Sequence, residues 1–226
     1  FLDMAHQLET RSEAIRVFAT HLSHELKSPL TSIRGAVELV RDEGHDMEEA
    51  VRQRFLDNVL FDTQRLSLLV QRLIELTRAE NTGRTNEATS LSESLSSLAS
   101  TPPIAVKLLC GGDTRLAIST EALGIVLANL LDNAAHHGAT RVTFRVHAQG
   151  KLARIELRDD GRGVSAANRS RIFEPFFTTR RESGGTGLGL GIVSALLRSH
   201  DGTIQLDETA TGAGFTFQLP LAGLSA

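Results

Sequence analysis

The stretch "NLLDNAAHHG", residues 129–138, closes an apolar segment that predicts a helix over residues 120–137. Asn129 and Asn133 are four residues apart and therefore share one face of that helix, with His136 and His137 on or near it. An asparagine oxygen is a neutral ligand that suits a Mg²⁺ ion already carrying phosphate oxygens. Asparagine is also common on helix surfaces, so the pair alone is weak evidence of a site.

A second feature follows in "RDDGRGV", residues 158–164. Asp159 ends a predicted strand, and Gly161 and Gly163 follow it in the spacing D-x-G-x-G. A carboxylate at the end of a strand can accept a hydrogen bond from the exocyclic amine of adenine, and the glycines let the backbone turn close to a ligand. Taken alone, the same residues fit an ordinary Asp-Gly turn equally well.

Two further features lie in "IFEPFFTTR", residues 172–180, and "GGTGLGLGI", residues 184–192. Phe176 and Phe177 are candidates to anchor a mobile segment, although core packing explains each of them singly. The glycines of the second stretch run directly into an apolar helix predicted over residues 188–199, where exposed backbone N–H groups can cradle phosphate. Their spacing is neither that of a P-loop nor G-x-G-x-x-G.

The two halves of the chain have different periodicities. Residues 1–80 show apolar residues at three-, four- and seven-residue steps, which predicts two long amphipathic helices in an antiparallel hairpin. Gly44 is the expected stop of the first helix, and Asp46 with Glu49 is the expected capping box of the second. The later half predicts an α+β sandwich with a largely antiparallel sheet and helices over 120–137, 166–173 and 188–199. Its expected strands are 104–110, 141–148, 153–159, 202–208 and 214–220.

The stretch "HLSHELKSPLTSIRG", residues 21–35, lies on the first predicted helix. The order of the four later features resembles the Bergerat-type ATPase superfamily. With "HELKSPL" upstream, the chain resembles a sensor histidine kinase over nearly its whole length. The resemblance implies an all-α helical hairpin that forms a dimeric four-helix bundle, followed by an α+β sandwich, the Bergerat ATP-binding fold. It divides the chain into the end of a membrane-proximal signalling helix (1–12), a dimerisation and phosphotransfer hairpin (13–80), a linker (81–90) and a catalytic domain (91–226).

The resemblance also assigns roles in the hairpin. His24, which an acid follows directly, is the phosphoacceptor rather than His21. Glu25 is expected to hold the imidazole in one tautomer and to stabilise the positive charge that develops on it. Ser28 occupies a position that helps to place the water for dephosphorylating a partner regulator.

In the catalytic domain, the resemblance makes Asn133 the main ligand of Mg²⁺ and Asn129 a supporting contact to ATP. Asp159 is expected to read adenine. The remaining candidate nucleotide-binding residues are His136, His137, Gly161, Gly163, Phe176, Phe177, Arg180, Gly185, Thr186, Gly187, Leu188 and Gly189. Arg180 and Arg181 are candidates for contact with the γ-phosphate, and a solvated basic loop explains them equally well.

Composition limits the classes of partner. A net charge of −3 and the absence of Trp and Tyr argue against nucleic acid as a partner. The single cysteine, Cys110, excludes an internal disulfide. The expected partners are a second copy of the chain and the receiver domain of a response regulator. We expect a cytoplasmic domain of a protein anchored in the bacterial inner membrane through an N-terminal region missing from this sequence.

Two other functions remain open on the sequence alone. One is a Bergerat-fold ATPase whose hydrolysis drives conformational change, and the other is a pseudokinase scaffold that uses the hairpin only to dimerise. The His24–Glu25 pair argues against the first, and the intact Asn133, Asp159 and glycines argue against the second. Pro29 also raises a hypothesis of its own, because it removes the helical donor to the Glu25 carbonyl and so predicts a bendable point beside His24.

His136 and His137 stand where many members of the family carry Lys and Tyr. If His136 takes the phosphate-contacting role of that lysine, its charge falls near neutral pH, because unperturbed histidine titrates at about pH 6.5. We therefore expect the ATP affinity of this chain to weaken between pH 6 and pH 8 by more than that of a His136→Lys variant. Titration calorimetry at both pH values measures this, and equal pH dependence in the two proteins would contradict it.

Overall fold

The computed structural model describes residues 2–81, 87–98, 104–180 and 185–223, with side chains from residue 16 except at 17, 80 and 81. These residues form two compact units. The first comprises Phe1–Gln71 with Arg180–Gly184, and the second comprises Arg72–Thr179 with Gly185–Ala226. Each unit has its own internal packing, and they are described separately.

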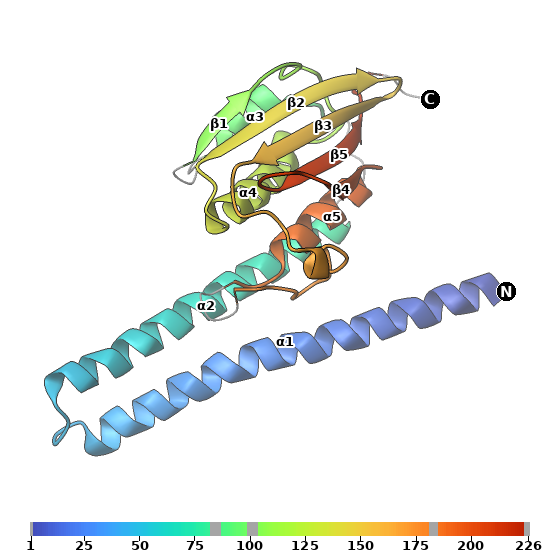
Figure 1. Ribbon diagram of the computed structural model, residues 1–226. Helices are drawn as coiled ribbons and strands as arrows, with labels where there is room; N and C mark the ends of the chain where they lie inside the picture. Colours follow the sequence, from blue (N-terminus) through green and yellow to red (C-terminus); the bar gives the residue numbers. More distant parts are fainter. Residues whose placement is uncertain (1, 82–86, 99–103, 181–184, 224–226) are drawn as a thin grey trace. The chain divides into compact units, whose positions relative to one another are not determined.

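The first unit is a helical hairpin, as predicted (Figure 1). Helix α1 spans Leu2–Glu43 and passes through Pro29 without ending, and helix α2 starts at Glu49 and runs on to Asn81 in the second unit. Pro29 is buried, so packing is available to offset its missing hydrogen bond. Within the described residues, no helix has the length and apolar character needed to cross a membrane.

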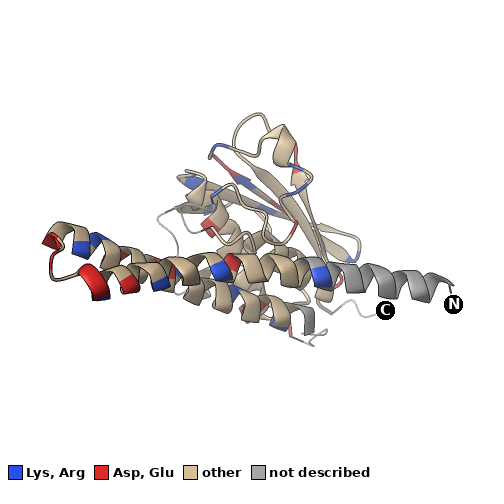
Figure 2. Cartoon of the chain, turned by 90° about the horizontal axis from the view of Figure 1, so that it is seen from below, with Lys and Arg blue, Asp and Glu red and all other residues tan. Residues whose placement is uncertain are grey.

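The turn between α1 and α2 is rich in acidic residues (Figure 2). The first helix ends at Glu43, immediately before Gly44, as expected. A side chain at position 44 would overlap the carbonyl oxygen of Val40, so glycine is required there. The expected capping box at Asp46 is wrong. The Asp46 N–H donates to the Glu43 carbonyl at 3.1 Å and belongs to the turn, while the first carbonyl of α2 to accept helical bonds is that of Glu48.

The second unit contains a five-stranded sheet in the order β1-β2-β3-β5-β4. The pair β1–β2 is parallel and the other three pairs are antiparallel, so the predicted α+β sandwich and all five strands are confirmed. Burial alternates along β2 and β3, and Figure 1 shows α4 and α5 on one side of this sheet. The strands are β1 (Ala105–Leu108), β2 (Arg141–Gln149), β3 (Leu152–Asp159), β4 (Thr203–Asp207) and β5 (Gly214–Pro220).

Apolar side chains fix this helical layer on the sheet. Helix α4 spans Thr120–His136 and α5 spans Gly189–Ser199, both close to their predicted bounds, and the two pack side by side. The burial of such side chains is the main favourable term in folding. Fully buried large side chains from both layers include Leu123, Leu127, Leu130, Phe144, Ile155, Leu157, Phe215 and Phe217.

One helix prediction failed in this unit, and one helix was not predicted. Residues 166–173 form only the 3₁₀ turn Ala166–Asn168 followed by further turns, because "AANRSRIF" lacks a continuous apolar stripe to pack. Conversely, α3 (Leu91–Ser97) was not expected in the serine-rich stretch 90–100. A capping box starts it: the Glu93 N–H donates to the Ser90 hydroxyl, and the Ser90 N–H donates to the Glu93 carboxylate, both at 3.2 Å.

We expect Ser90→Ala to lower the unfolding free energy of the second unit by about 1 kcal/mol, since loss of an N-cap side chain typically costs that much. Urea unfolding followed by circular dichroism measures the change. Ser96→Ala is the matched control, because the exposed Ser96 hydroxyl only donates to a carbonyl within its own helix. Equal stability of the two variants would contradict a capping role.

Candidate functional site

The asparagine face of α4 meets the start of α5. The Asn129 side chain is buried, and its Nδ2 donates to the Ile125 carbonyl at 2.9 Å. This bond turns Oδ1 towards α5, where it lies 3.0 Å from the position that a Cβ on Gly189 would occupy. The structure therefore brings Asn129 and Gly189 together, as the predicted site requires, with Asn133 one turn further along α4 and half-buried.

Asp159, the last residue of β3, has one carboxylate oxygen fixed by the backbone. Its Oδ1 accepts from the Gly161 N–H at 2.9 Å and from the Ala213 N–H at 3.0 Å. Within the described part of the chain, no hydrogen bond engages its Oδ2. The geometry thus leaves one oriented oxygen available to accept a hydrogen bond from a ligand.

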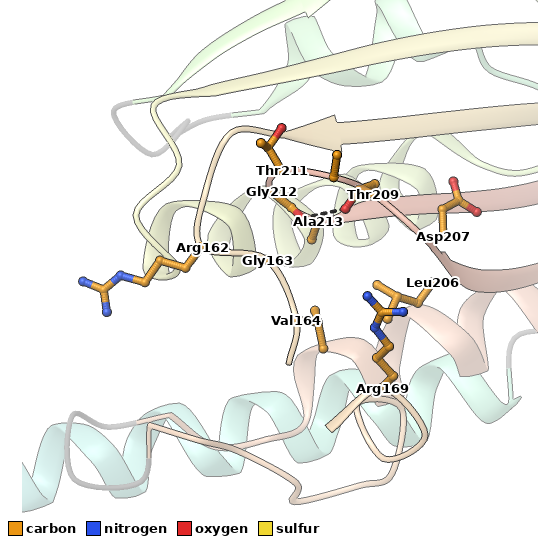
Figure 3. A pocket seen from close by; sticks show the side chains of 11 residues that line it. Arg162, Gly163, Val164, Arg169, Leu206, Asp207, Thr209, Thr211, Gly212 and Ala213 are labelled. Atoms are coloured by element: carbon orange, nitrogen blue, oxygen red, sulfur yellow. Dashed lines mark hydrogen bonds between the residues drawn. The ribbon is translucent and has the colours of Figure 1, made fainter. Parts of the chain in front are cut away.

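Glycines are required around this carboxylate because backbone segments approach one another closely. Gly163 has φ +72° and Gly212 has φ +66°, and a Cβ on Gly163 would lie 2.6 Å from the Gly212 carbonyl oxygen. A Cβ on Gly212 would overlap the Asp159 carbonyl. A small pocket of about 130 Å³ lies beside these two glycines, and Arg162 is among the residues that line it. Figure 3 shows the Arg162 side chain extending away from the other labelled residues.

The ends of the segment between Phe176 and Gly187 are tied to each other. The Phe176 N–H donates to the Gly187 carbonyl at 2.9 Å. Phe176 is buried with φ 66°, whereas Phe177 is half-buried with the Arg171 guanidinium 4.5 Å from its ring centroid. Phe176 thus anchors the segment more firmly than Phe177 does.

The residues that lead into α5 are ordered around Thr186. Its hydroxyl accepts from the N–H of Leu188 at 3.4 Å, and Leu188 is buried. Gly185 is half-buried, and the residues before it, including the candidate Arg181, lie outside the described residues. Arg180 belongs to the first unit. No group of three or more potential His, Cys, Asp or Glu metal ligands occurs among the residues that the structure describes.

In the hairpin, His24 and Ser28 are exposed on α1. The Glu25 carboxylate accepts from Arg65 Nη2 on α2 at 3.0 Å, and both side chains are mostly buried, at 11% and 17% exposed. Burial strengthens such a charge-assisted bond and makes loss of one partner costly. A hydrogen bond from His24 to Glu25 therefore stays a prediction, because Glu25 is engaged by Arg65 here.

Two carboxylates that the sequence did not single out lie beside the predicted site. Asp132, next to Asn133, pairs with Arg72 Nη2 at 3.2 Å. The Asp160 carboxylate accepts from the backbone N–H groups of Arg141 and Thr140 and from the Thr140 hydroxyl, and these bonds lower its pKa. A lowered pKa means that this contribution to stability is present above the unfolded pKa and is lost as the pH falls through the folded pKa. The adjacent acids in "DDG" are the sequence signal for Asp160.

The histidines that end α4 lie close to the turn after β3. His136 is exposed, and His137 is the C-cap of the helix, with its N–H directed to the carbonyls of the last turn. The His137 carbonyl accepts from the Arg162 N–H at 3.1 Å. The end of α4 is therefore bonded to the D-x-G-x-G turn through the backbone.

Comparison with known proteins identifies both halves. The family model "His Kinase A (phospho-acceptor) domain" matches residues 14–82, and the model "Histidine kinase-, DNA gyrase B-, and HSP90-like ATPase" matches residues 119–223. The chain belongs to the sensor histidine kinase family. The second unit accordingly has the α+β ATP-binding fold that histidine kinases share with gyrase B and HSP90.

Curated relatives agree with this assignment. The probable sensor histidine kinase TcrY of Mycobacterium tuberculosis is 34% identical, in an alignment covering 92% of this chain and 46% of the relative. The sensor-like histidine kinase SenX3 of Mycobacterium bovis is 32% identical, covering 92% and 54%. The chain spans about half the length of these relatives.

Solved histidine kinases share the fold. Histidine kinase ThkA, solved in complex with the response regulator protein TrrA, has a TM-score of 0.70 at 20% identity, covering 94% of this chain and 64% of that one. Acinetobacter baumannii histidine kinase AdeS has a TM-score of 0.66 at 21% identity, covering 88% and 98%.

We expect Gly187→Ala to disturb the segment before α5. Gly187 has φ +68°, so alanine there strains the backbone. Its Cβ would also overlap the backbone of Phe176, which adds a steric clash. Gly150→Ala is the matched control, because Gly150 has φ +62° and nothing within 4 Å of its Cβ position. Gly187→Ala should lose roughly 1–3 kcal/mol more unfolding free energy than the control in thermal or urea unfolding. Equal losses would show that the close contact with Phe176 is unimportant.

Proposed function

We propose that this chain is an ATP-dependent protein-histidine kinase core that phosphorylates His24 within a homodimer and then passes the phosphoryl group to an aspartate of a response regulator. The observation that carries the proposal is the combination of two sites in one chain. One is an exposed histidine, His24, next to the mostly buried Glu25 on a hairpin. The other is a unit of helices and a sheet in which Asn129 lies beside Gly189 and the Asp159 carboxylate is oriented by backbone donors.

The catalytic unit fits Mg-ATP at three points. Asp159 Oδ2 is oriented to accept from the 6-amine of adenine. Asn133, with Asn129 in support, offers neutral oxygens to Mg²⁺, which neutralises the phosphate charge when bound. The backbone around Gly187 and Gly189 at the start of α5 offers N–H groups to phosphate oxygens. The other residues proposed to line the nucleotide site are His136, His137, Gly185, Thr186 and Leu188.

The transfer itself depends on the His24 imidazole. A ring nitrogen that carries a lone pair attacks the γ-phosphorus, an N–P bond forms, and the bond from phosphorus to the β,γ-bridging oxygen breaks as ADP leaves. Glu25 accepts the other ring N–H and stabilises the developing positive charge. For this it must exchange or share its bond with Arg65, so Arg65 sets how readily the acid becomes available.

Dimerisation would cover apolar surface that the hairpin leaves exposed. Leu30 and Leu60 are 54% and 58% exposed, and such a concentration of exposed apolar side chains marks an interaction surface. A second hairpin completing a four-helix bundle would bury it. Among the described side chains of α1 and α2, the other exposed large apolar residues are Val37, Leu39, Val51, Leu56, Phe61, Leu68, Val70 and Ile74.

The response regulator is proposed as the phosphoryl acceptor from family membership. Ser28, exposed one turn after His24, keeps a hydroxyl that can orient water for dephosphorylating the regulator. We place this core on the cytoplasmic side of a membrane-anchored sensor, again from family membership.

The decisive experiment incubates the chain with γ-labelled ATP and Mg²⁺ and tests for protein-bound label that is acid-labile and alkali-stable. His24→Gln should abolish the label, because it removes the nucleophile, whereas the matched control His21→Gln should retain it. Asn133→Ala should reduce labelling by at least about 100-fold, as expected for loss of a group that positions the metal and phosphates. Asn58→Ala, an exposed asparagine on α2, is its control.

The outcomes separate the competing functions. Label that persists undiminished in His24→Gln would refute the phosphoacceptor assignment. ATP hydrolysis without protein-bound label would favour an ATPase that uses the hairpin only to dimerise, and absence of nucleotide binding would favour a scaffold. Light scattering on each variant establishes that the dimer is retained.

A further inference from the structure

The orientation of the Asp159 carboxylate depends on the turn that follows it. One of the two donors that fix its Oδ1 is the Gly161 N–H, which lies within that turn. If the turn shifts, this donor moves and only the Ala213 N–H still holds Oδ1. A single hydrogen bond leaves the carboxylate more freedom to rotate, so the position of the adenine-reading oxygen depends in part on residues 160–162.

Asp160 connects this turn to the segment that follows α4. Its Oδ1 accepts from the Thr140 N–H at 2.7 Å and the Arg141 N–H at 2.9 Å, and its Oδ2 accepts from the Thr140 hydroxyl at 2.9 Å. The Asp160 N–H donates in turn to the Arg141 carbonyl at 3.3 Å. Both carboxylate oxygens are thus used, and these three donors belong to Thr140, immediately before β2, and to Arg141, its first residue.

The turn also lies directly on the end of α4. The Arg162 N–H donates to the His137 carbonyl, and a Cβ on Gly161 would lie 2.9 Å from that same oxygen. His137 caps α4, and its N–H is directed to the carbonyls of Asn133 and Ala134. Hydrogen bonds from Asp160 and Arg162, the neighbours of Gly161, therefore hold this turn next to the C-terminal end of α4, the helix that carries Asn129 and Asn133.

We propose that Asp160 is a positioning residue that gives this site its preference for adenine over guanine, by holding the Asp159 turn against the segment 137–141. This rests on the proposed binding of adenine by Asp159. Adenine presents an amine donor at position 6, where guanine presents a carbonyl oxygen, so a fixed carboxylate accepts from the first base and repels the second. A carboxylate that can rotate away loses this discrimination. Guanine is rejected only if the carboxylate oxygen must stay opposite the guanine carbonyl and cannot turn to another partner.

The test measures binding of ADP and of GDP, each with Mg²⁺, to the full 226-residue chain by titration calorimetry. Diphosphates are used because they bind without being consumed, so the result is independent of kinase activity. We expect Asp160→Ala to weaken ADP binding by about tenfold and GDP binding by less than about twofold, in line with loss of charge-assisted bonds that act only through the base-reading carboxylate.

Asp160→Asn is the conservative variant. Its amide oxygen can still accept both backbone N–H groups, and its amide nitrogen can donate to the Thr140 oxygen. It should therefore recover ADP binding to within about threefold of the unsubstituted chain. Rescue by a neutral isostere would show that the hydrogen bonds, rather than the negative charge itself, set the preference.

Ser119→Ala controls for a general loss of stability. The Ser119 hydroxyl caps the other end of α4 by accepting from the Ala122 N–H at 3.1 Å. This variant should lower the melting temperature without changing the ratio of ADP to GDP affinity. The inference is overturned if Asp160→Ala leaves that ratio unchanged, if Ser119→Ala changes it equally, or if Asp160→Asn is as defective as the alanine variant.

The inference and the proposed function fail in different ways. Normal ADP preference with no labelling of His24 would remove the kinase proposal and leave the role of Asp160 standing. Labelling of His24 together with an unchanged ratio in Asp160→Ala would do the reverse. A chain with no preference for ADP over GDP would remove the inference outright.

Discussion

Two backbone N–H groups that donate to one oxygen of Asp159 constrain the geometry of much of the second unit. One donor belongs to the turn after β3 and the other to Ala213, immediately before β5, so strand pairing and turn geometry must both be correct for the carboxylate to be oriented. Backbone donors give a rigid site because they have no side-chain rotamers to order. This arrangement requires glycine at positions 163 and 212, because their left-handed conformations and crowded surroundings exclude side chains.

The sequence predicted most of the fold because the spacing of its apolar residues changes clearly between segments. Alternation identified all five strands, and the longer period identified α1, α2, α4 and α5. It failed where local capping decides the structure. The serine-rich composition obscured α3, although Ser90 and Glu93 have the spacing of a capping box. The same spacing at Asp46 and Glu49 was misleading, because Asp46 forms part of the hairpin turn. A capping box therefore needs its surroundings before it predicts a helix start.

The candidate site divides in the same way. Motif spacing placed Asn129 and Gly189 in one site, and the structure brings them into contact. Spacing said nothing of Asp160, whose donors lie about twenty residues earlier and meet it only through pairing of β2 with β3. Spacing likewise said nothing of Arg65, which comes from the other helix of the hairpin and pairs with Glu25; the expected bond from His24 to Glu25, which the resemblance implies, stays a prediction. Contacts distant in sequence are those that spacing cannot reveal.

The bond between the Phe176 N–H and the Gly187 carbonyl has a consequence for how such a chain can vary. It holds Phe176 beside Gly187, so α5 starts from the same place whatever residues lie between these two in the sequence. The entropy of closing a flexible loop grows only logarithmically, at about 0.6 kcal/mol for each doubling of length. A change in the number of residues between Phe176 and Gly187 should therefore cost little, and related proteins can differ in length there while Asn129 and the start of α5 keep their relative positions.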